Sequence, residues 1–264
     1  MTQWKTFLLA GFASLLLAVP ASADDKAHFV LVPGAWHVGA AWQPVIGRLD
    51  AQGYTAQALT LPGHGKDADR AGVTFADAEA TLIEAVRSHD GNVILVGHSA
   101  AGVLLQQAAG KVADQLDAVV FHNAFLIEDG TSLEQNLPPD IAATFRQIAE
   151  ASGDNSIGVG EQFWRNVLLA GVEEDRATEI IGMMVPQPFG FYTHEIDTSS
   201  FADVKAPKFV LLATDDASLP PGAWAGMAMW FGQATTVEIS GGHEVLLTDP
   251  DAVAQGLATI AESL

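Results

Sequence analysis

The sequence predicts an α/β protein in which a mostly parallel central sheet is flanked by helices and carries a small, mainly helical cap insertion. Three observations support this fold class. Short apolar runs bounded by Gly, Pro or Asn recur along the chain, and amphipathic stretches separate them. One central region interrupts this alternation. Continuous apolar runs are typical of strands buried on both faces of a parallel sheet. With 264 residues and 49% hydrophobic content, the chain is long enough for one domain with a sizeable core.

Four strands are predicted in the first half of the chain, with helices between them. The strands fall within residues 28–34 (HFVLVPG), 54–65 (YTAQALTLPGHG), 92–97 (NVILVG) and 116–125 (LDAVVFHNAF). The helices fall within residues 42–52, 74–89 and 100–115. This alternation indicates parallel strands that are joined by helical crossovers.

The alternation of predicted strands and helices is interrupted over residues 128–200, which we expect to form the cap insertion. Helical stretches are predicted there within residues 139–151, 161–170 and 173–184. The alternation then returns, with strands within 207–216 and 235–244, a helix near 221–231 and a last helix from about Asp251. We therefore expect a core of residues 24–127 and 201–264, interrupted after its fourth strand.

The first 23 residues predict a cleaved export signal. Lys5 precedes an apolar stretch over residues 7–19, and the sequence Ala-Ser-Ala at 21–23 offers a small-residue cleavage site before Asp24. These are the parts of a secretory signal peptide. The alternative is an uncleaved membrane anchor, but the apolar stretch is short for a spanning helix. We therefore expect an exported protein, periplasmic or secreted, with no membrane contact once residues 1–23 are removed.

The chain is strongly acidic and lacks cysteine. Its 12 Lys and Arg against 32 Asp and Glu give a formal net charge of -20. Such a charge disfavours nucleic acids and anionic membranes as partners. The absence of cysteine excludes thiol catalysis, disulfides and thiolate metal sites. No HExxH or related metal spacing is present either, because His243-Glu244 has no second histidine one helical turn later, and we expect no metal site.

Residues 93–102, VILVGHSAAG, place Ser99 where a predicted strand meets a predicted helix. A serine at such a sharp turn is the nucleophile of enzymes with a G-x-S-x-G motif, in which small neighbours let the strand and the helix pass closely. Gly97 meets that steric demand on one side, whereas Ala101 occupies the usual glycine position on the other. The alternative is a structural turn without a catalytic role.

A serine nucleophile needs a base, and the base needs an acid that orients it. His243 lies on the Gly-rich loop SGGHE after the last predicted strand, and Asp215 and Asp216 follow the strand before it. The chain order Ser, Asp, His is the order that this kind of fold requires. We interpret His243 as the general base, and position alone allows either Asp215 or Asp216 as the orienting acid.

The loop after the first strand, VPGAW at 32–36, is expected to help bind a developing oxyanion. The candidate donors are the backbone N–H groups of Ala35, in this loop, and Ala100, at the start of the helix after Ser99. The predicted substrate-binding residues are Trp36, His98 and Trp164. Ordinary packing is the alternative for His98 and Trp164. His37 either lines the oxyanion loop or satisfies backbone groups.

Five separated motifs carry a family resemblance: FVLVPGAWHVGAAW, LTLPGHG, VGHSAAG, DDASLPP and GGHEVLLTDP. Together they resemble the α/β-hydrolase superfamily, and more narrowly its branch of plant methyl esterases and hydroxynitrile lyases with small bacterial esterase relatives. The resemblance covers nearly all of residues 28–262 but is weak across the cap. It implies the α/β-hydrolase fold, a Ser-His-Asp triad and no metal or organic cofactor. The branch commonly places its aspartate four residues before a proline, which selects Asp216, although the longer spacing of some lyases selects Asp215.

Two positions depart from the pattern of this branch. Pro33 stands where the first motif usually has histidine, which puts the shape of the oxyanion loop in question. Glu244 follows the catalytic histidine, where the lyases carry a lysine that handles cyanide. The resemblance therefore argues against a cyanohydrin lyase.

These residues together predict a serine hydrolase that cleaves a small carboxylic ester through an acyl-enzyme. Ser99 is the expected nucleophile, His243 the base and Asp216 the orienting acid. One alternative is the same triad acting on another bond, in lactone, amide or carbon–carbon cleavage or in perhydrolysis. The other is a ligand-binding protein on the same fold. The expected partner is a small-molecule ester, and the acyl and alcohol preferences and the oligomeric state are left open.

Overall fold

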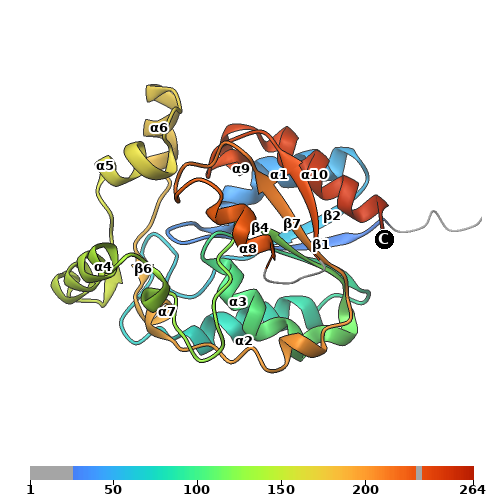
Figure 1. Ribbon diagram of the computed structural model, residues 1–264, viewed down its shortest axis with the longest axis horizontal. Coiled ribbons are helices and arrows are strands. Elements are labelled where there is room, and N and C mark those ends of the chain that lie inside the picture. Colours follow the sequence, from blue (N-terminus) through green and yellow to red (C-terminus); the bar gives the residue numbers. More distant parts are fainter. Residues whose placement is uncertain (1–25, 230–233) are drawn as a thin grey trace, which may run out of the picture.

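The central sheet is parallel throughout its described strands and places β3 and β4 at its middle (Figure 1). The structure, a computed structural model, describes residues 26–229 and 234–264, so the expected signal segment at 1–23 lies outside the described residues. Within the described part, six strands pair in the order β2-β1-β3-β4-β7-β8. They are β1 (His28–Val32), β2 (Thr55–Ala58), β3 (Val93–His98), β4 (Leu116–His122), β7 (Lys208–Ala213) and β8 (Thr235–Ile239). The predicted fold class is confirmed.

The apolar runs that predicted the strands are buried because helices cover both faces of the sheet. β3 is buried at every position, and β1 at every position except its first. One face carries α1 (Gln43–Ala51), α9 (Val245–Thr248) and α10 (Pro250–Glu262), and the other carries α2 (Phe75–Arg87) and α3 (Ala101–Ala108) (Figure 1). β2 is an edge strand whose residues alternate between exposed and half-buried. It is shorter than the predicted run at 54–65.

Side-chain caps fix where two of these helices begin. Thr74 accepts a hydrogen bond from Asp77 N–H, and the Asp77 carboxylate accepts one from Thr74 N–H, which forms a capping box at the start of α2. The Asp249 side chain accepts from Ala252 N–H, and Pro250 occupies the first position of α10. α10 then packs along α1, and the short helix α9 separates it from the loop that carries His243.

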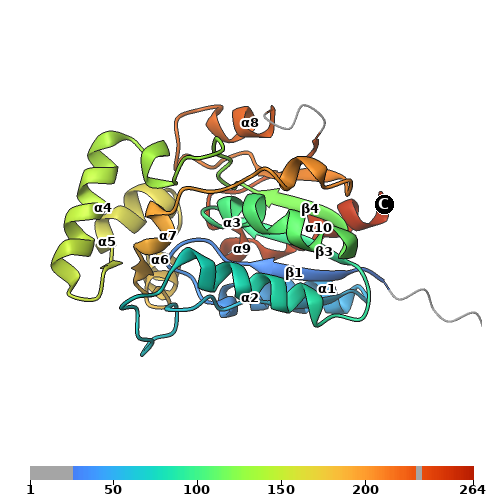
Figure 2. The same cartoon turned by 90° about the horizontal axis from the view of Figure 1, so that it is seen from below.

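The segment of residues 128–200, between β4 and β7, contains elements that lie together beyond one end of the sheet (Figure 2). Its helical elements are η3 (Glu134–Asn136), α4 (Pro139–Ser152), α5 (Glu161–Phe163), the π-helical turn η4 (Trp164–Leu168), α6 (Glu174–Ile181) and α7 (Gly190–Thr193). A two-stranded antiparallel pair, β5 (Ser156–Ile157) with β6 (Gln187–Pro188), is also present and was not predicted. Strands this short carry no alternating pattern, so only long-range pairing reveals them.

The remaining short helices lie in the connections of the core. They are η1 (Gly39–Trp42), η2 (Ala109–Gln115), η5 (Phe201–Asp203) and α8 (Ala223–Ala228). α8 lies within the helix predicted near 221–231, and the last part of that prediction falls on residues 230–233, which lie outside the described residues.

The strand registers bring the chemistry-bearing residues to one edge of the sheet. His98, the last residue of β3, pairs with His122, the last residue of β4. Ser99 therefore follows one strand where Asn123 follows the next. Asp216 comes shortly after β7, and His243 shortly after β8. Because the carboxyl ends of parallel strands meet at one edge, these side chains gather there.

Candidate active site

Ser99 lies at the turn between β3 and α3, in a backbone conformation that few residues adopt. Its φ of 53° is in the left-handed region, which costs a non-glycine residue about 1–3 kcal/mol. The surrounding chain holds the turn in place. Ser99 N–H donates to His122 O at 3.2 Å, and Ser99 O accepts from Gly102 N–H at 3.1 Å and Phe125 N–H at 3.0 Å. This strained turn is the geometry that presents a serine hydroxyl at the end of a sheet.

Two glycines make the close contacts around this turn. A Cβ at Gly97 would lie 2.8 Å from the methyl carbons of Leu105, and a Cβ at Gly102 would lie 2.2 Å from Phe125 O. Ala101, which occupies the usual glycine position of the motif, is fully enclosed and 1% exposed. A methyl group therefore fits at Ala101, whereas one at Gly102, a residue later, would meet the chain that follows β4.

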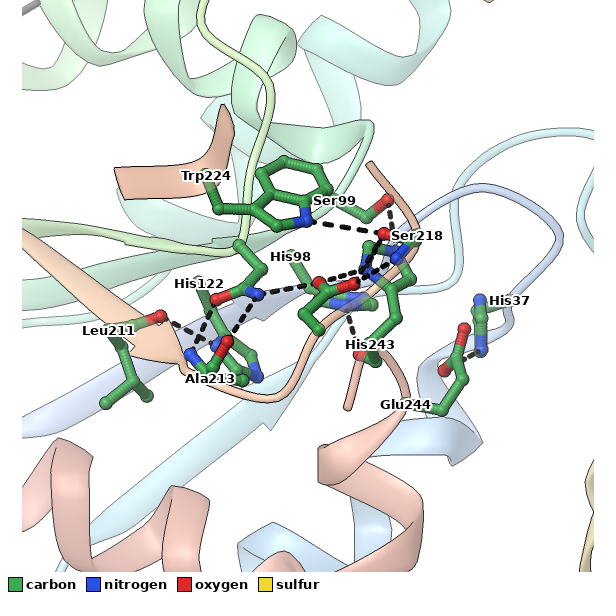
Figure 3. A network of polar contacts seen from close by, with 12 residues as sticks. His37, His98, Ser99, His122, Leu211, Ala213, Ser218, Trp224, His243 and Glu244 are labelled. Carbon is green, nitrogen blue, oxygen red and sulfur yellow. Dashed lines mark hydrogen bonds and ion pairs between the residues drawn. The ribbon is translucent and has the colours of Figure 1, made fainter. Parts of the chain in front are cut away.

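His243 joins Ser99 to Asp216 in a continuous chain of contacts (Figure 3). His243 Nε2 lies 2.9 Å from Ser99 Oγ, and His243 Nδ1 lies 2.7 Å from Asp216 Oδ2. A carboxylate only accepts hydrogen bonds, so Nδ1 carries the proton and Nε2 offers its lone pair to the Ser99 hydroxyl. The arrangement is therefore able to take the proton from Ser99 Oγ.

Asp216 is held by three donors besides His243. Ser218 Oγ–H and Ser218 N–H donate to Asp216 Oδ1 at 2.5 and 2.9 Å, and Asn123 Nδ2–H donates to Asp216 Oδ2 at 2.6 Å. Burial by itself raises the pKa of Asp216, but the hydrogen bonds from His243, Ser218 and Asn123, with the charge of His243, outweigh it. The pKa is held well below its usual value, so Asp216 stays ionised beside His243.

The neighbouring Asp215 points elsewhere. Its carboxylate is exposed and accepts a hydrogen bond from Gly241 N–H at 2.9 Å, so it ties together the loops that follow β7 and β8. The structure thus brings Asp216, and not Asp215, to His243.

Three side chains around this chain of contacts were not predicted. Asn123 has a φ of 37°, and its Oδ1 accepts from Ala213 N–H at 2.7 Å. Trp224 stacks on the His243 ring at a centroid distance of 5.5 Å and donates Nε1–H to Ser218 Oγ at 3.3 Å. Ser218, two residues after an aspartate, fits the sequence signal of an Asx turn, and Asn123 directly follows a strand; both signals were visible in the sequence.

His98 does not line the cavity that opens at Ser99 and His243, which corrects the expected binding role. It is 1% exposed, and its Nε2–H donates to the backbone O of His243 at 3.0 Å. Burial lowers its pKa well below the usual value, and the charges of His243, His122 and His37 lower it further. Burial likewise lowers the pKa of His122 to about 4. Both rings therefore stay neutral under the site, and His98 supports the backbone of His243.

The two expected oxyanion donors lie on either side of Ser99. Ala100 is the residue before α3, and Ala35 lies in the loop after β1. In the described chain, neither N–H has a hydrogen-bond acceptor. A Cβ at Gly34 would lie 2.9 Å from Ser99 Cβ, so the loop backbone packs directly on Ser99. These two N–H groups are free to bind an oxygen next to the Ser99 hydroxyl.

A cavity of about 230 Å³ opens at Ser99 and His243. Its other walls come from the loops around the site and from the segment between β4 and β7: Trp36, Phe125, Leu137, Pro138, Ile141, Phe145, Phe163, Val167, Leu168, Tyr192, Ser218, Leu219 and Trp224. None of the described residues lining it is Asp, Glu, Lys or Arg. The hydroxyl of Tyr192, a residue 4% exposed, has no hydrogen-bond partner in the described chain. The cavity is therefore lined mainly by apolar and aromatic side chains.

Of the two predicted tryptophans, only Trp36 lines the cavity. Trp164 is 2% exposed and packs edge-on against Trp36, with ring centroids 5.6 Å apart. This corrects the expected binding role of Trp164, which supports the wall from behind. The sequence placed Trp164 in the correct segment but did not indicate which way its ring faces.

Two further properties concern the described residues as a whole. Over residues 26–229 and 234–264, no group of three or more His, Cys, Asp or Glu side chains is placed to hold a metal ion. No helix in the same ranges combines the length and the apolar character needed to span a membrane.

Comparison with known proteins places this geometry in a family. The chain matches the model of the alpha/beta hydrolase family over residues 29–256. A carbendazim hydrolyzing esterase from Nocardioides sp. (strain SG-4G) is 26% identical over 246 residues, which cover 89% of this chain and 99% of the esterase. An alpha-hydroxynitrile lyase from Arabidopsis thaliana is 26% identical over 261 residues, covering 90% of this chain and 98% of the lyase.

A solved structure is similar to this chain over most of its length. It is an extracellular alpha/beta-hydrolase from a Paenibacillus species, described as sharing structural and functional homology with tobacco salicylic acid binding protein 2. Its TM-score is 0.83 at 25% sequence identity, and the alignment covers 88% of this chain and 98% of that one. The family model's match, residues 29–256, includes the turn at Ser99 and the loop at His243.

Proposed function

Because the chain belongs to the alpha/beta hydrolase family, we propose that it hydrolyses a small, uncharged carboxylic ester through an acyl-enzyme. The family match confirms the resemblance predicted from the five motifs. One observation carries the proposal: the chain from Ser99 through His243 to Asp216, with distances of 2.9 and 2.7 Å, opens into an apolar cavity. The esterase among the relatives supports the same reaction class.

The first half of the reaction forms the acyl-enzyme. Ser99 Oγ attacks the ester carbonyl while His243 Nε2 takes the hydroxyl proton. The imidazolium that results is stabilised by Asp216, whose depressed pKa keeps it ionised. His243 then gives the proton to the alkoxide oxygen of the leaving alcohol, and the ester C–O bond breaks.

The oxyanion of the tetrahedral intermediate is bound by the N–H groups of Ala35 and Ala100. Removing a single donor of this kind typically lowers kcat by about 10²–10³. The N–H of Ala100 also lies at the N-terminus of α3, where the helix dipole favours negative charge.

The second half releases the acid. A water molecule takes the place of the alcohol, His243 accepts one of its protons, and the resulting hydroxide attacks the acyl carbonyl. Ser99 Oγ leaves with the proton that His243 returns to it. The two halves together consume the ester and one water molecule and release the alcohol and the acid.

The cavity supports an uncharged substrate. An ionised group would lose its hydration on entry and find no opposite charge among the described lining residues. Carbon–carbon cleavage is the second candidate, because a hydroxynitrile lyase is among the relatives. Glu244, which replaces the lysine of the lyases, does not line the cavity and lies 3.0 Å from His37, which favours ester hydrolysis.

Export is a further part of the proposal. Residues 1–23 have the pattern of a signal peptide, and the Paenibacillus neighbour is described as extracellular. Expression of the full chain, followed by N-terminal sequencing of the protein from the periplasm and the medium, tests it. A protein that begins at Asp24 in those fractions supports export, and an unprocessed protein retained in the cytoplasm contradicts it.

A substrate panel tests the activity. p-Nitrophenyl acetate and butyrate, an aromatic methyl ester, a lactone, an anilide and mandelonitrile are compared on the wild type and on Ser99→Ala. We expect the esters to be the best substrates, and Ser99→Ala to lower their turnover by about 10³–10⁶-fold. Cleavage of mandelonitrile without ester hydrolysis would establish a lyase instead. Near-wild-type turnover by Ser99→Ala would remove Ser99 from the mechanism.

A further inference from the structure

The peptide between Ala35 and Trp36 is held at both ends by buried side chains. Its carbonyl, Ala35 O, accepts a hydrogen bond from His37 Nδ1–H at 2.7 Å. Its amide, Trp36 N–H, donates to Gln187 Oε1 at 3.3 Å. Trp36 has a φ of 65°, in the left-handed region that is strained for a non-glycine residue. Such a conformation persists only where surrounding contacts enforce it.

The two contacts at Ala35 O and Trp36 N–H form a clamp on this peptide. On its His37 side the clamp is backed by a buried ion pair. His37 Nε2 lies 3.0 Å from Glu244 Oε2, and the two side chains are 2% and 1% exposed. Figure 3 shows the pair facing each other to one side of His243. Burial alone lowers the pKa of His37, but the charge of Glu244 and the hydrogen bonds with Glu244 and Ala35 O together outweigh it, and the pKa is raised. The pKa of Glu244, which burial alone raises, is lowered by His37.

The Gln187 side is also backed by a buried histidine. His64 Nε2–H donates to the same Oε1 atom of Gln187 at 2.7 Å, and Gln187 Nε2–H donates to Pro188 O at 3.2 Å. The amide group of Gln187 is therefore fixed before it meets Trp36 N–H. The clamp thus joins the loop after β1 to the first residue of β6 as well as to the His243 loop.

The direction of Ala35 N–H depends on this clamp. Ala35 N–H belongs to the preceding peptide, whose carbonyl, Gly34 O, accepts from His37 N–H at 3.4 Å. Because the peptides on both sides of Ala35 are held, the φ and ψ angles of Ala35 are fixed. The Ala35 N–H bond therefore keeps a single orientation. Glu244 is the residue next to His243. One short loop therefore positions the general base and, through His37, also the oxyanion donor Ala35 N–H.

We propose that Glu244 and His37 are positioning residues for the oxyanion hole: Glu244 holds the His37 ring, and His37 fixes Ala35 N–H toward the developing oxyanion. The proposal rests on the proposed function, because it gives Ala35 its role there. It also explains the function of a glutamate at the position where the lyases carry lysine. Neither side chain touches the substrate cavity.

Two substitutions of His37 separate its two contacts. In His37→Asn the amide nitrogen takes about the place of Nδ1, which keeps the donor to Ala35 O and removes the contact with Glu244. In His37→Gln the amide takes about the place of Nε2, which keeps the contact with Glu244 and removes the donor to Ala35 O. Glu244→Gln removes the charge without changing the shape. The control is Glu79→Gln, since Glu79 is a buried carboxylate paired with Lys111 at 2.6 Å outside this loop.

The readouts are kcat, KM and the inhibition constants of two ligands. A trifluoromethyl ketone forms a tetrahedral adduct that places an oxyanion in the hole, whereas the product carboxylic acid does not. We expect His37→Gln to lower kcat about 10- to 100-fold, less than the full loss of a donor, with KM within about threefold. The inhibition constant of the ketone rises by the same factor, and that of the acid stays unchanged. His37→Asn and Glu244→Gln show the same pattern to a smaller degree.

Three results overturn the proposal: wild-type kcat in His37→Gln, an unchanged ketone inhibition constant when kcat falls, or an equal loss in Glu79→Gln. Circular dichroism checks that each variant is folded. Where His37→Gln does not fold, Glu244→Gln carries the same test. Failure of the proposed function is distinguishable, because the wild type would then hydrolyse no ester and form no adduct with the ketone.

Discussion

Gly102 sets the spacing between α3 and the chain that follows β4, so a methyl group at this position tests the account of the Ser99 turn. In Gly102→Ala the Cβ would lie 2.2 Å from Phe125 O and 3.0 Å from Phe125 N. A carbon and a carbonyl oxygen approach to about 3.3 Å, so helix and loop must separate by about 1 Å. Overpacking of this kind costs about 1–3 kcal/mol of unfolding free energy. Gly102 N–H and Phe125 N–H both donate to Ser99 O, and a displacement of about 1 Å at a catalytic group costs about 10² in rate.

The assay combines kinetics with unfolding. Steady-state hydrolysis of p-nitrophenyl butyrate is expected to show a kcat about 100-fold below wild type, and urea unfolding a lower midpoint with an unchanged m-value. Ala101→Gly is the matched control, because it changes one methyl group at the adjacent position. Its cost is about 0.5–1 kcal/mol from backbone entropy, with kcat close to wild type. A Gly102→Ala enzyme with wild-type kcat and stability would refute the reasoning.

Asp216 and the cavity wall supply three further predictions. Asp216→Asn lowers kcat about 10⁴-fold, because the amide favours the wrong tautomer of His243; a loss below tenfold in steady-state kinetics speaks against the orienting role. The depressed pKa of Asp216 means that its contribution to stability is complete above about pH 4 and is lost as the pH falls further. Urea unfolding from about pH 5 to about pH 3 should therefore show a smaller loss of stability in Asp216→Asn than in wild type, and parallel curves contradict this. Tyr192→Phe raises KM for esters with a hydrogen-bond acceptor about tenfold, whereas simple alkyl esters keep theirs; equal effects on both classes rule out a contact with the Tyr192 hydroxyl.

The central strands were predictable because they are buried on both faces. β1, β3 and β4 read as continuous apolar runs, and this pattern arises only where helices cover both sides of a sheet. β2 is an edge strand of four residues with half-exposed positions, so its end was not visible within the longer run at 54–65. The pair of β5 and β6 was missed for a different reason. Two residues in each strand form no pattern, and their pairing joins positions far apart in the sequence.

The site was predictable as far as chain order and local motifs reach. Ser99 and His243 follow strands in the required order, and the structure brings them together. The choice between Asp215 and Asp216 depended on which of two adjacent side chains turns toward the base, and adjacent side chains point in different directions. Asp215 turns to Gly241 N–H instead. Motif order thus locates a site to within a loop, and backbone direction selects the residue.

Side-chain direction also explains the two corrected residues. His98 ends β3, so its side chain follows the strand alternation and lies under the sheet edge, where it meets the carbonyl of His243. Trp164 begins a π-helical turn, which alters the spacing that would indicate its direction. Asn123 was missed although it directly follows a predicted strand. Its role depends on Asp216, which is far along the sequence, so the local pattern did not single it out.

The central claim is that Ser99 is a nucleophile activated by His243. Its most direct test is the mass of the protein after reaction with a fluorophosphonate, followed by peptide mapping of the modified residue. The account predicts one phosphonyl group per chain, located on Ser99, with labelling absent from Ser99→Ala and strongly slowed in His243→Ala. An unmodified protein, or a modification that persists in Ser99→Ala, would contradict it.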